Sequence, residues 1–300
     1  MGSSGKAGQL VTLEPDTNLE PRVAIPHISF SQLSTYTRCS MQYFYAYVMG
    51  IRSKPSLALV VGSGGHSALE YNGRHKIKTG QDLAVPDMLD MASTFIEYEQ
   101  QELDADAATK DEKGEAKDRA LASLRVYQTR DAPNINPAGV EVEFNLDLNT
   151  YYNEEPIRII NGKIDLITTD TGIIDYKFVG KARSQNEVDI SPQLTLYGKV
   201  FHTLTGKYPS HAGYQMFLPG STRTPADSRG ILRDPDLMKP QVQETRFKRL
   251  QFQFQQVEKA IRTGIFIPTD NPMTCAWCGY RDRCQSSLTN DIEAAQIRSH

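Results

Sequence analysis

The sequence lacks the long apolar segments that mark membrane proteins, and it lacks a strong excess of charge of either sign. No run approaches the roughly 18 consecutive apolar residues of a membrane span, and the N-terminus has no apolar signal-peptide core. The 33 Lys and Arg and 36 Asp and Glu residues leave a formal net charge of −3, which argues against a surface that is basic throughout. We therefore expect a soluble protein with no membrane partner, in the cytoplasm of a bacterial, archaeal or phage-infected cell.

Cysteine is also scarce, because the chain of 300 residues has four of them. That number is too small for a disulfide scaffold and suits a reducing compartment. Three lie in the C-x2-C-x5-C pattern of "TCAWCGYRDRC", as Cys275, Cys278 and Cys284, while Cys39 stands alone in "TYTRCSMQYFYAY". A site built from all four thiolates would stabilise the fold by closing a very long loop. Zinc accepts four thiolates, although its structural sites more often use two C-x2-C-like pairs, and uncoordinated thiols are a further alternative.

The rest of the chain is long enough for a large domain, with 39% hydrophobic residues to fill a core. We expect a disordered arm at residues 1–26, a single domain at residues 27–286 and a tail at residues 287–300. The expected helices are at residues 28–50, 57–80, 192–206 and 240–266, with an exposed helical insertion at about residues 81–130. The expected strands are at residues 139–148, 157–167, 172–178 and 211–219, and residues 221–236 read as an irregular loop. This order predicts an α/β core with helical elaboration.

One predicted hairpin, "NGKIDLITTDTGIIDYK" at residues 161–177, carries acids inside apolar strands. A turn centred on Asp170 would place Asp165 and Asp175 opposite each other, with Cβ atoms roughly 4.5–5.5 Å apart. Two carboxylates at that distance repel unless one takes up a proton or they share a cation. Lys177 is two residues beyond Asp175 and therefore lies on the same face of its strand. The alternative is a surface hairpin whose charges form ordinary ion pairs.

These residues suit phosphodiester hydrolysis, which needs a divalent cation and a water made nucleophilic. Two close aspartates supply the oxygen ligands that Mg²⁺ and Mn²⁺ prefer, and an added imidazole from His66 would favour Mn²⁺. Lys177 could orient the water or stabilise the phosphate. Gln193 and Tyr197 are i,i+4 neighbours on one helical face and could contact DNA; packing on the helix surface is the alternative.

Further polar residues flank this set. Glu141 and Glu143 precede the hairpin and could border the same site, and Lys181 and Arg183 could guide phosphate if they are not part of a solvated loop. The predicted helix at residues 240–266 carries a basic stripe that is either a path for a DNA strand or a polar face. The stripe consists of Arg246, Lys248, Arg249, Lys259 and Arg262.

Five motifs of this chain, taken in order from Ser29 to Cys284, resemble those of one nuclease superfamily. "GKIDLITTDTGIIDYK" is similar to the central motif of PD-(D/E)xK nucleases. "GSGGHSALE" and "QLTLY" resemble the G-x-x-H and Q-x3-Y motifs of the RecB-like branch. The cysteine pattern, with "SQLSTYTRC" before it, resembles the iron-sulfur subgroup that includes the AddB nuclease domain, CRISPR-adaptation nucleases and phage exonucleases.

The resemblance implies a restriction-endonuclease-like α/β fold, with a central mixed sheet flanked by helices, a helical N-terminal region and a C-terminal iron-sulfur tail. It implies roles for eleven residues, beginning with Lys177 as the catalytic lysine. The implied metal ligands are His66, Asp165, Asp175 and the backbone carbonyl of Tyr176; the implied substrate-positioning residues are Gln193 and Tyr197; the implied ligands of a 4Fe-4S cluster are Cys39, Cys275, Cys278 and Cys284. Two departures are Ser40, where the family commonly has proline, and Asp175, where glutamate is commoner in the wider superfamily.

Taken together, the sequence predicts a Mg²⁺- or Mn²⁺-dependent deoxyribonuclease. We expect an exonuclease that hydrolyses phosphodiester bonds in single-stranded DNA or at DNA ends, during repair, recombination or related DNA processing. Homo-oligomers and partner proteins of recombination or CRISPR adaptation stay open. One alternative is a non-catalytic iron-sulfur scaffold that binds DNA, and another is a zinc-stabilised hydrolase that uses the aspartates as acid and base on a non-nucleic substrate.

Overall fold

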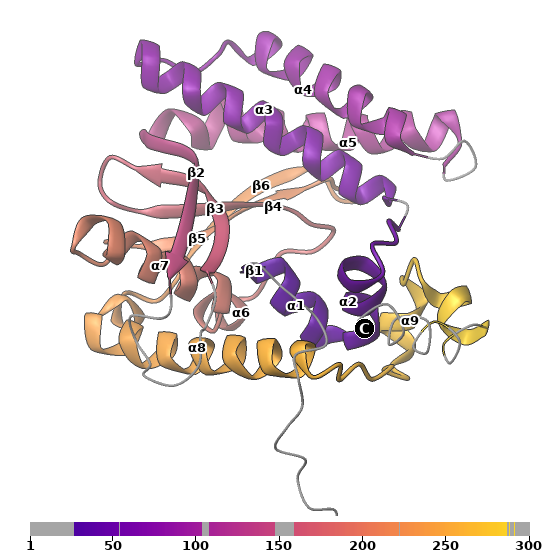
Figure 1. The fold of residues 1–300 in the computed structure, drawn as a ribbon. Helices are drawn as coiled ribbons and strands as arrows, with labels where there is room; N and C mark the ends of the chain where they lie inside the picture. The colour runs from indigo at the N-terminus through magenta and orange to yellow at the C-terminus, as the bar shows by residue number, and fades with distance from the viewer. Residues whose placement is uncertain are drawn as a thin grey trace, which may run out of the picture.

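The computed structural model is an α/β assembly in which helices cover both faces of one mixed sheet (Figure 1). It describes residues 27–53, 55–103, 108–147, 159–221, 223–286, 288 and 291. The predicted arm at residues 1–26 and nearly all of the predicted tail at residues 287–300 lie outside this set. None of the described helices is both long and apolar enough for a membrane span. The fold class predicted from sequence is therefore confirmed for the sheet and its helices.

The elements follow one another along the chain as helices, strands, then alternating helices and strands. The strands are β1 (His27–Ser29), β2 (Pro137–Asp147), β3 (Ile159–Thr168), β4 (Ile173–Phe178), β5 (Ala212–Leu218) and β6 (Asp227–Leu232). The α-helices are α1 (Phe30–Arg38), α2 (Ser40–Tyr43), α3 (Leu57–Thr79), α4 (Val85–Glu99), α5 (Lys110–Val126), α6 (Gln185–Asp189), α7 (Pro192–Thr205), α8 (Pro240–Arg262) and α9 (Pro272–Ala276). Short π or 3₁₀ segments are η1 (Phe44–Val48), η2 (Gln100–Glu102), η3 (Tyr127–Asp131), η4 (Ala132–Asn134) and η6 (Pro235–Met238).

Strand β3 organises the sheet because both of its edges are used. The strand order is β1-β3-β4-β5-β6, and β2 pairs with β3 off this path, along the whole length of β3. The other edge of β3 is shared: β1 pairs in parallel with residues 159–161, and β4 pairs antiparallel with Leu166 and Ile167 alone. Residues 162–165 lie between these two ladders. A gap therefore opens in the middle of this edge, and Asp165 lies in it.

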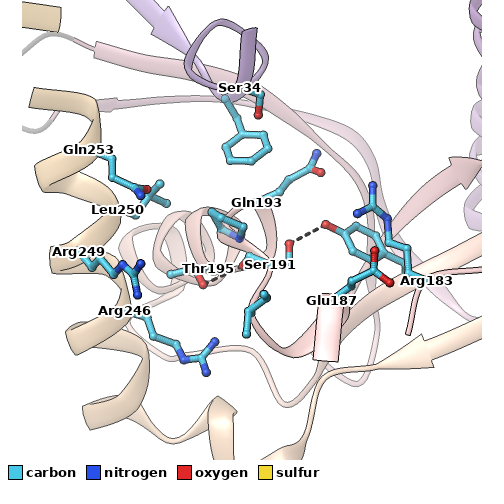
Figure 2. Close-up of a pocket in the computed structure, with 14 residues that line it drawn as sticks. Ser34, Arg183, Glu187, Ser191, Gln193, Thr195, Arg246, Arg249, Leu250 and Gln253 are labelled. Carbon is cyan, nitrogen blue, oxygen red and sulfur yellow. Dashed lines mark hydrogen bonds between the residues drawn. The ribbon is translucent and has the colours of Figure 1, made fainter. Parts of the chain in front are cut away.

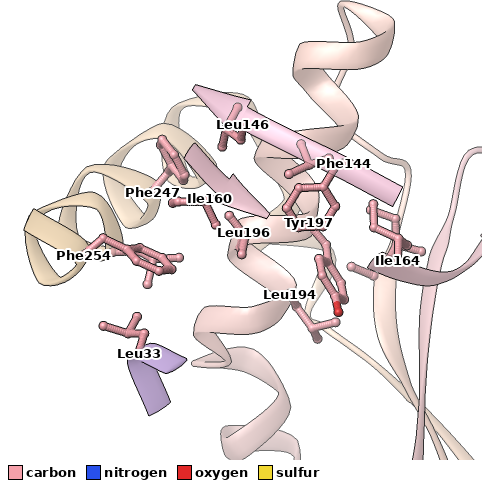
Figure 3. Packing of buried hydrophobic residues seen from close by; sticks show 14 of the residues in the cluster. Leu33, Phe144, Leu146, Ile160, Ile164, Leu194, Leu196, Tyr197, Phe247 and Phe254 are labelled. Atoms are coloured by element: carbon pink, nitrogen blue, oxygen red, sulfur yellow. The ribbon is translucent and has the colours of Figure 1, made fainter. Parts of the chain in front are cut away.

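Each face of the sheet has its own hydrophobic core. One core lies under α1, α7 and α8 and includes Leu33, Leu196 and Phe254 (Figure 3). The other lies under α3, α4 and α5 and includes Met88 and Leu124. Figure 1 shows α3, α4 and α5 together on one side of the sheet and α8 on the other. The site described below lies where α3 and α7 approach the sheet from opposite faces.

The structure confirms the hairpin and the helix that the sequence predicted at residues 161–177 and 192–206. The turn at residues 168–172 joins β3 to β4, with Thr171 at a left-handed φ of 67°. The register Leu166↔Ile174 is that of a turn centred on Asp170, as predicted. Helix α7 begins at Pro192 and ends at Thr205, and it is capped by Gly206, whose φ of 77° is the left-handed conformation that glycine adopts readily.

Three predicted elements were wrong in detail. The first helix is interrupted at Cys39, whose extended φ of −162° and ψ of 110° separate α1 from α2. The insertion at about residues 81–130 is not simply exposed, since the inner faces of α4 and α5 are buried against the sheet and α3. The stretch read as a loop contains strand β6, which a polar and irregular sequence concealed.

Close packing of α3 on α4 gives a test of the fold. A Cβ atom at Gly64 would lie 2.6 Å from the backbone Cα and N of Ile96, which cannot move independently of α4. We expect Gly64→Ala to lower the free energy of unfolding by roughly 1–3 kcal/mol. The matched control is Gly62→Ala in the same helix, where the nearest atom would be 3.9 Å away and helix propensity should raise stability by about 0.5–1 kcal/mol. Urea denaturation of both variants measures the difference; equal effects would contradict the packing.

Candidate active site

His66 reaches the sheet because α3 packs unusually close to β4. A Cβ atom on the neighbouring Gly65 would lie 2.1 Å from Cζ of Phe178, so only glycine leaves room for that ring. Phe178 is in turn stacked on Phe217, with ring centroids 4.6 Å apart. This contact brings the imidazole of His66 to the gap in the sheet, where its Nδ1 lies 3.6 Å from Oδ2 of Asp165.

Asp165 holds β3 and β4 apart. The ladder between the strands ends at Leu166↔Ile174, one pair before the two aspartates would meet. Instead, the backbone N–H of Tyr176 donates to Oδ2 of Asp165 at 2.8 Å. The predicted register is therefore correct, but the two carboxylates are not a hydrogen-bonded cross-strand pair. The side chain of Asp165 takes the place that a main-chain carbonyl would have in a regular sheet.

Asp175 is the centre of a second group of polar side chains. Its Oδ2 lies 2.6 Å from Nζ of Lys177, as the period-2 rule predicts. Its Oδ1 accepts a hydrogen bond of 2.9 Å from Nε2 of Gln193, and the same nitrogen lies 2.9 Å from the hydroxyl of Tyr197. Gln193 therefore contacts the acid directly, and Tyr197, on the same helical face, is linked to it through Gln193.

Glu141 is a site residue that the sequence identified only as a neighbour. Its flanking residues Val140 and Val142 pair with Leu166 and Ile164, so Glu141 lies opposite Asp165 in the ladder. Its φ of 48° is rare for a residue with a side chain and marks local strain. Donor atoms of Glu141, Asp165 and His66 lie within 4.8 Å of one another. The signal available in the sequence was that Glu141 belongs to the predicted strand that precedes the strand of Asp165, so the two acids could lie opposite each other.

Glu143 lies elsewhere. It pairs with Lys163 across the β2–β3 ladder, with 3.2 Å between Nζ and Oε1, and both side chains are more than half exposed. This pair is an ordinary surface ion pair.

Burial perturbs every acid of the site in the same direction. Desolvation raises the pKa of both Asp165 and Asp175 to about 6, and the nearby charge of Asp165 also raises that of Asp175. Burial and the negative charge of Glu70 raise the pKa of Glu141. Burial lowers the pKa of His66, which favours the neutral imidazole. Acids that resist ionisation beside a neutral imidazole form a site that a divalent cation stabilises.

The donor set fits a divalent metal ion. His66, Glu141 and Asp165 offer one nitrogen and two carboxylate oxygens within the shell of a single ion, which suits Mn²⁺ or Mg²⁺. Asp175 is outside this closest group, because its carboxylate contacts Lys177 and Gln193. The site thus consists of a metal-binding half and a half that contains the lysine.

A search against protein families matches residues 27–285 to the PD-(D/E)XK nuclease superfamily. The chain belongs to this superfamily. Its fold is similar to the crystal structure of a protein from Eubacterium rectale described as a "Putative exonuclease", with a TM-score of 0.54 and 13% sequence identity. The similarity covers 92% of this chain and 94% of the other. No curated protein matches the sequence. Membership in the superfamily establishes a metal-dependent nuclease, and the resemblance inferred from the motifs is confirmed at that level.

The four cysteines lie around one small pocket, at the opposite end of α1 from β1. Cys39, Cys275, Cys278 and Cys284 all line this cavity of about 80 Å³. Burial raises the pKa of Cys284, and the sulfurs of the other three act in the same direction. Among the described residues, no three of these sulfurs lie within 4.8 Å of one another, whereas tetrahedral zinc would hold its thiolates about 3.8 Å apart. The arrangement is therefore wider than a preformed zinc site.

The raised pKa values give a test based on pH. Asp165 and Asp175 have a pKa of about 6 in the folded protein and about 3.9 when unfolded. The folded state therefore binds more protons between these values, and metal-free protein should lose stability as the pH rises from about 4 to about 6. Asp175→Asn should make the metal-free protein roughly 1–2 kcal/mol more stable at pH 7.5 and change it little at pH 4.

Urea denaturation in EDTA at both pH values measures this difference. Mn²⁺ added at pH 7.5 serves as a control, because it should stabilise the wild-type protein. A variant that is less stable than wild type at pH 7.5 without metal would contradict a raised pKa at Asp175.

Proposed function

We propose that this nuclease is a Mg²⁺- or Mn²⁺-dependent deoxyribonuclease that acts on single-stranded DNA or on DNA ends. The observation that carries the proposal is the convergence of His66, Glu141 and Asp165 on one point, beside the Asp175–Lys177 contact. An exonuclease is favoured because the structurally similar protein from Eubacterium rectale is described as one. DNA repair, recombination or related DNA processing in the cytoplasm is the corresponding cellular role.

In this proposal the chain holds the metal ion from two elements on either side of the gap. His66 comes from α3, and Glu141 and Asp165 come from the paired strands β2 and β3. The ion would neutralise phosphate charge and lower the pKa of a bound water. The backbone carbonyl of Tyr176 acts to raise the pKa of His66 and is therefore near enough to be a further candidate ligand. Asp175, whose carboxylate contacts Lys177 and Gln193, is another candidate ligand.

Lys177 supplies positive charge next to the metal half of the site. Its Nζ contacts Asp175 at 2.6 Å and lies 5.5 Å from the ring centre of Tyr214. The carboxylate and the ring restrict where the ammonium group can lie. A cation fixed there before substrate binds can orient the attacking water or stabilise the negative charge that develops on phosphate. Gln193 and Tyr197 would position both Asp175 and the DNA.

Lys177→Ala tests catalysis directly. Loss of the ammonium group should lower the rate of DNA cleavage with Mn²⁺ by about 10²- to 10³-fold, while DNA affinity in EDTA changes little. The control is Lys207→Ala, which removes an exposed lysine just after α7 and should leave cleavage unchanged. End-labelled single-stranded and duplex DNA measure both activities and the direction of degradation. Equal cleavage by the Lys177 variant and wild type would contradict the proposal; binding without cleavage in wild type would instead support a non-catalytic scaffold.

We further propose that the cysteine pocket holds a 4Fe-4S cluster. Support comes from the four thiols that line one cavity and from their separation, since no three sulfurs of these described cysteines lie within 4.8 Å of one another. The position of the pocket between α2 and the C-terminal segment also suits a cluster that joins distant parts of the chain. The ring of Tyr280 stacks on Tyr45, and its hydroxyl donates to the carbonyl of Ile51 at 2.9 Å, so the two parts are in contact near the pocket.

Removal of one thiol tests this assignment. Anaerobically purified wild-type protein should contain about four iron and four sulfide per chain, and Cys278→Ser should lose most of both. Thermal unfolding should shift to lower temperature by several degrees, because a long loop is no longer closed. Met273→Ser, on an exposed residue of the same segment, is the control. Colourless wild-type protein with stoichiometric zinc would contradict the cluster.

A further inference from the structure

A second and larger pocket opens beside the candidate active site. Its volume is about 670 Å³, and it lies between α1, the α6–α7 region and α8 (Figure 2). Three arginines line it: Arg183 from one side and Arg246 and Arg249 from α8 on the other. Figure 2 shows these side chains around Gln193, which lies between the two groups.

The pocket carries net positive charge. Glu187 is the one acid among its lining residues. Its carboxylate accepts from the backbone N–H and the hydroxyl of Ser184, at 2.7 and 2.8 Å, and so caps α6. These hydrogen bonds lower the pKa of Glu187. One carboxylate that is already hydrogen-bonded leaves two of the three guanidinium charges unbalanced, so the pocket favours an anion.

Two contacts connect this pocket to the nuclease centre. Gln193 lines the pocket and donates to Oδ1 of Asp175. Tyr214 also lines it, and its ring centre lies 5.2 Å from Cζ of Arg183 and 5.5 Å from Nζ of Lys177. A strand whose phosphate is at Lys177 would therefore place a neighbouring phosphate or base in the pocket.

The arginines have donors available for a ligand. Nε of Arg183 is buried and has no hydrogen-bond partner among the described residues, and Arg249 is exposed. Arg246 uses Nη1 to donate to the carbonyl of Asp189. Phe30 and Pro192 add apolar surface to the same cavity. Guanidinium donors bind phosphate, and an aromatic ring beside them offers a surface on which an unstacked base can pack.

We propose that this arginine pocket, defined by Arg183, Arg246 and Arg249, binds the nucleotides of single-stranded DNA on one side of the cleaved phosphate. The inference rests on the proposed function and adds a substrate subsite to it. The volume suits one or two nucleotides and excludes a duplex. Arg183 and Arg249 hold backbone phosphates, and Phe30 packs against a base. Recognition of this kind depends on the strand being unpaired.

The test is DNA binding without metal, so that cleavage plays no part. Fluorescence anisotropy in EDTA, on a labelled single-stranded oligonucleotide at several salt concentrations, compares wild type with Arg249→Ala and Arg183→Gln. Each variant should bind about 10-fold more weakly and should lower the slope of log affinity against log salt by about 0.7. Lys248→Ala is the matched control, because it removes a neighbouring exposed charge of α8 that does not line the pocket.

The outcomes separate the two proposals. Unchanged affinity in correctly folded Arg249→Ala, or an equal loss in Lys248→Ala, would overturn the arginine pocket even if the wild-type protein cleaves DNA with Mn²⁺. An equal loss of affinity for a blunt duplex would also overturn it, since the site would then not select single strands. Absence of cleavage by wild type, with the arginine effects intact, would instead refute the nuclease proposal and leave the pocket in place. Thermal unfolding of each variant checks its fold.

Discussion

The hydrogen bond from the backbone N–H of Tyr176 to the carboxylate of Asp165 is the constraint on which the site depends. Because a side chain accepts this bond, β3 and β4 separate after only two residue pairs, and the ladder leaves a gap at its centre. The same edge of β3 then pairs with β1, which continues directly into α1. A carboxylate that accepts a hydrogen bond in place of a main-chain carbonyl therefore opens the candidate metal site. It also leaves the other end of this edge free to pair with β1, so that α1 begins at the opposite end of the gap.

The site is assembled at the expense of local stability. Glu141 has a left-handed backbone inside a strand, and Asp175 is 1% exposed with a pKa raised by burial and by Asp165. Strain and buried acids of this kind persist only where the surrounding structure enforces them. The enforcing contacts are the β2–β3 ladder and the packing of α3, which a glycine allows to approach Phe178. A divalent ion would offset the buried charge, which is why metal binding and stability should be coupled here.

The sequence predicted the hairpin register and the i,i+4 pair of α7, because turn residues and helical spacing are local signals. His66 was identified through the resemblance of its segment to the G-x-x-H motif. The sequence placed Glu141 only at the border of the site, because a positive φ within a strand cannot be recognised from the alternation of apolar and polar residues. The interruption at Cys39 was missed for a similar reason: helical spacing continues across it. Strand β6 is polar and at the edge of the sheet, so its pairing with β5 comes from tertiary context, which local sequence does not contain.

Helix α1 links the arginine pocket to the cysteine pocket, and under the two proposals above this would give the cysteines a role beyond stability. Its first residue, Phe30, lines the arginine pocket, and it ends at Cys39. Tyr36 and Ser40 donate to the carbonyls of Ile265 and Ile267, just after α8. Since α8 carries Arg246 and Arg249, these bonds fix the distance between the two walls of the pocket at one end. A cluster bound by Cys39 and the C-terminal cysteines would fix the same distance more firmly. Loss of the cluster would therefore lower the affinity for DNA before it disturbed the metal ligands on the sheet.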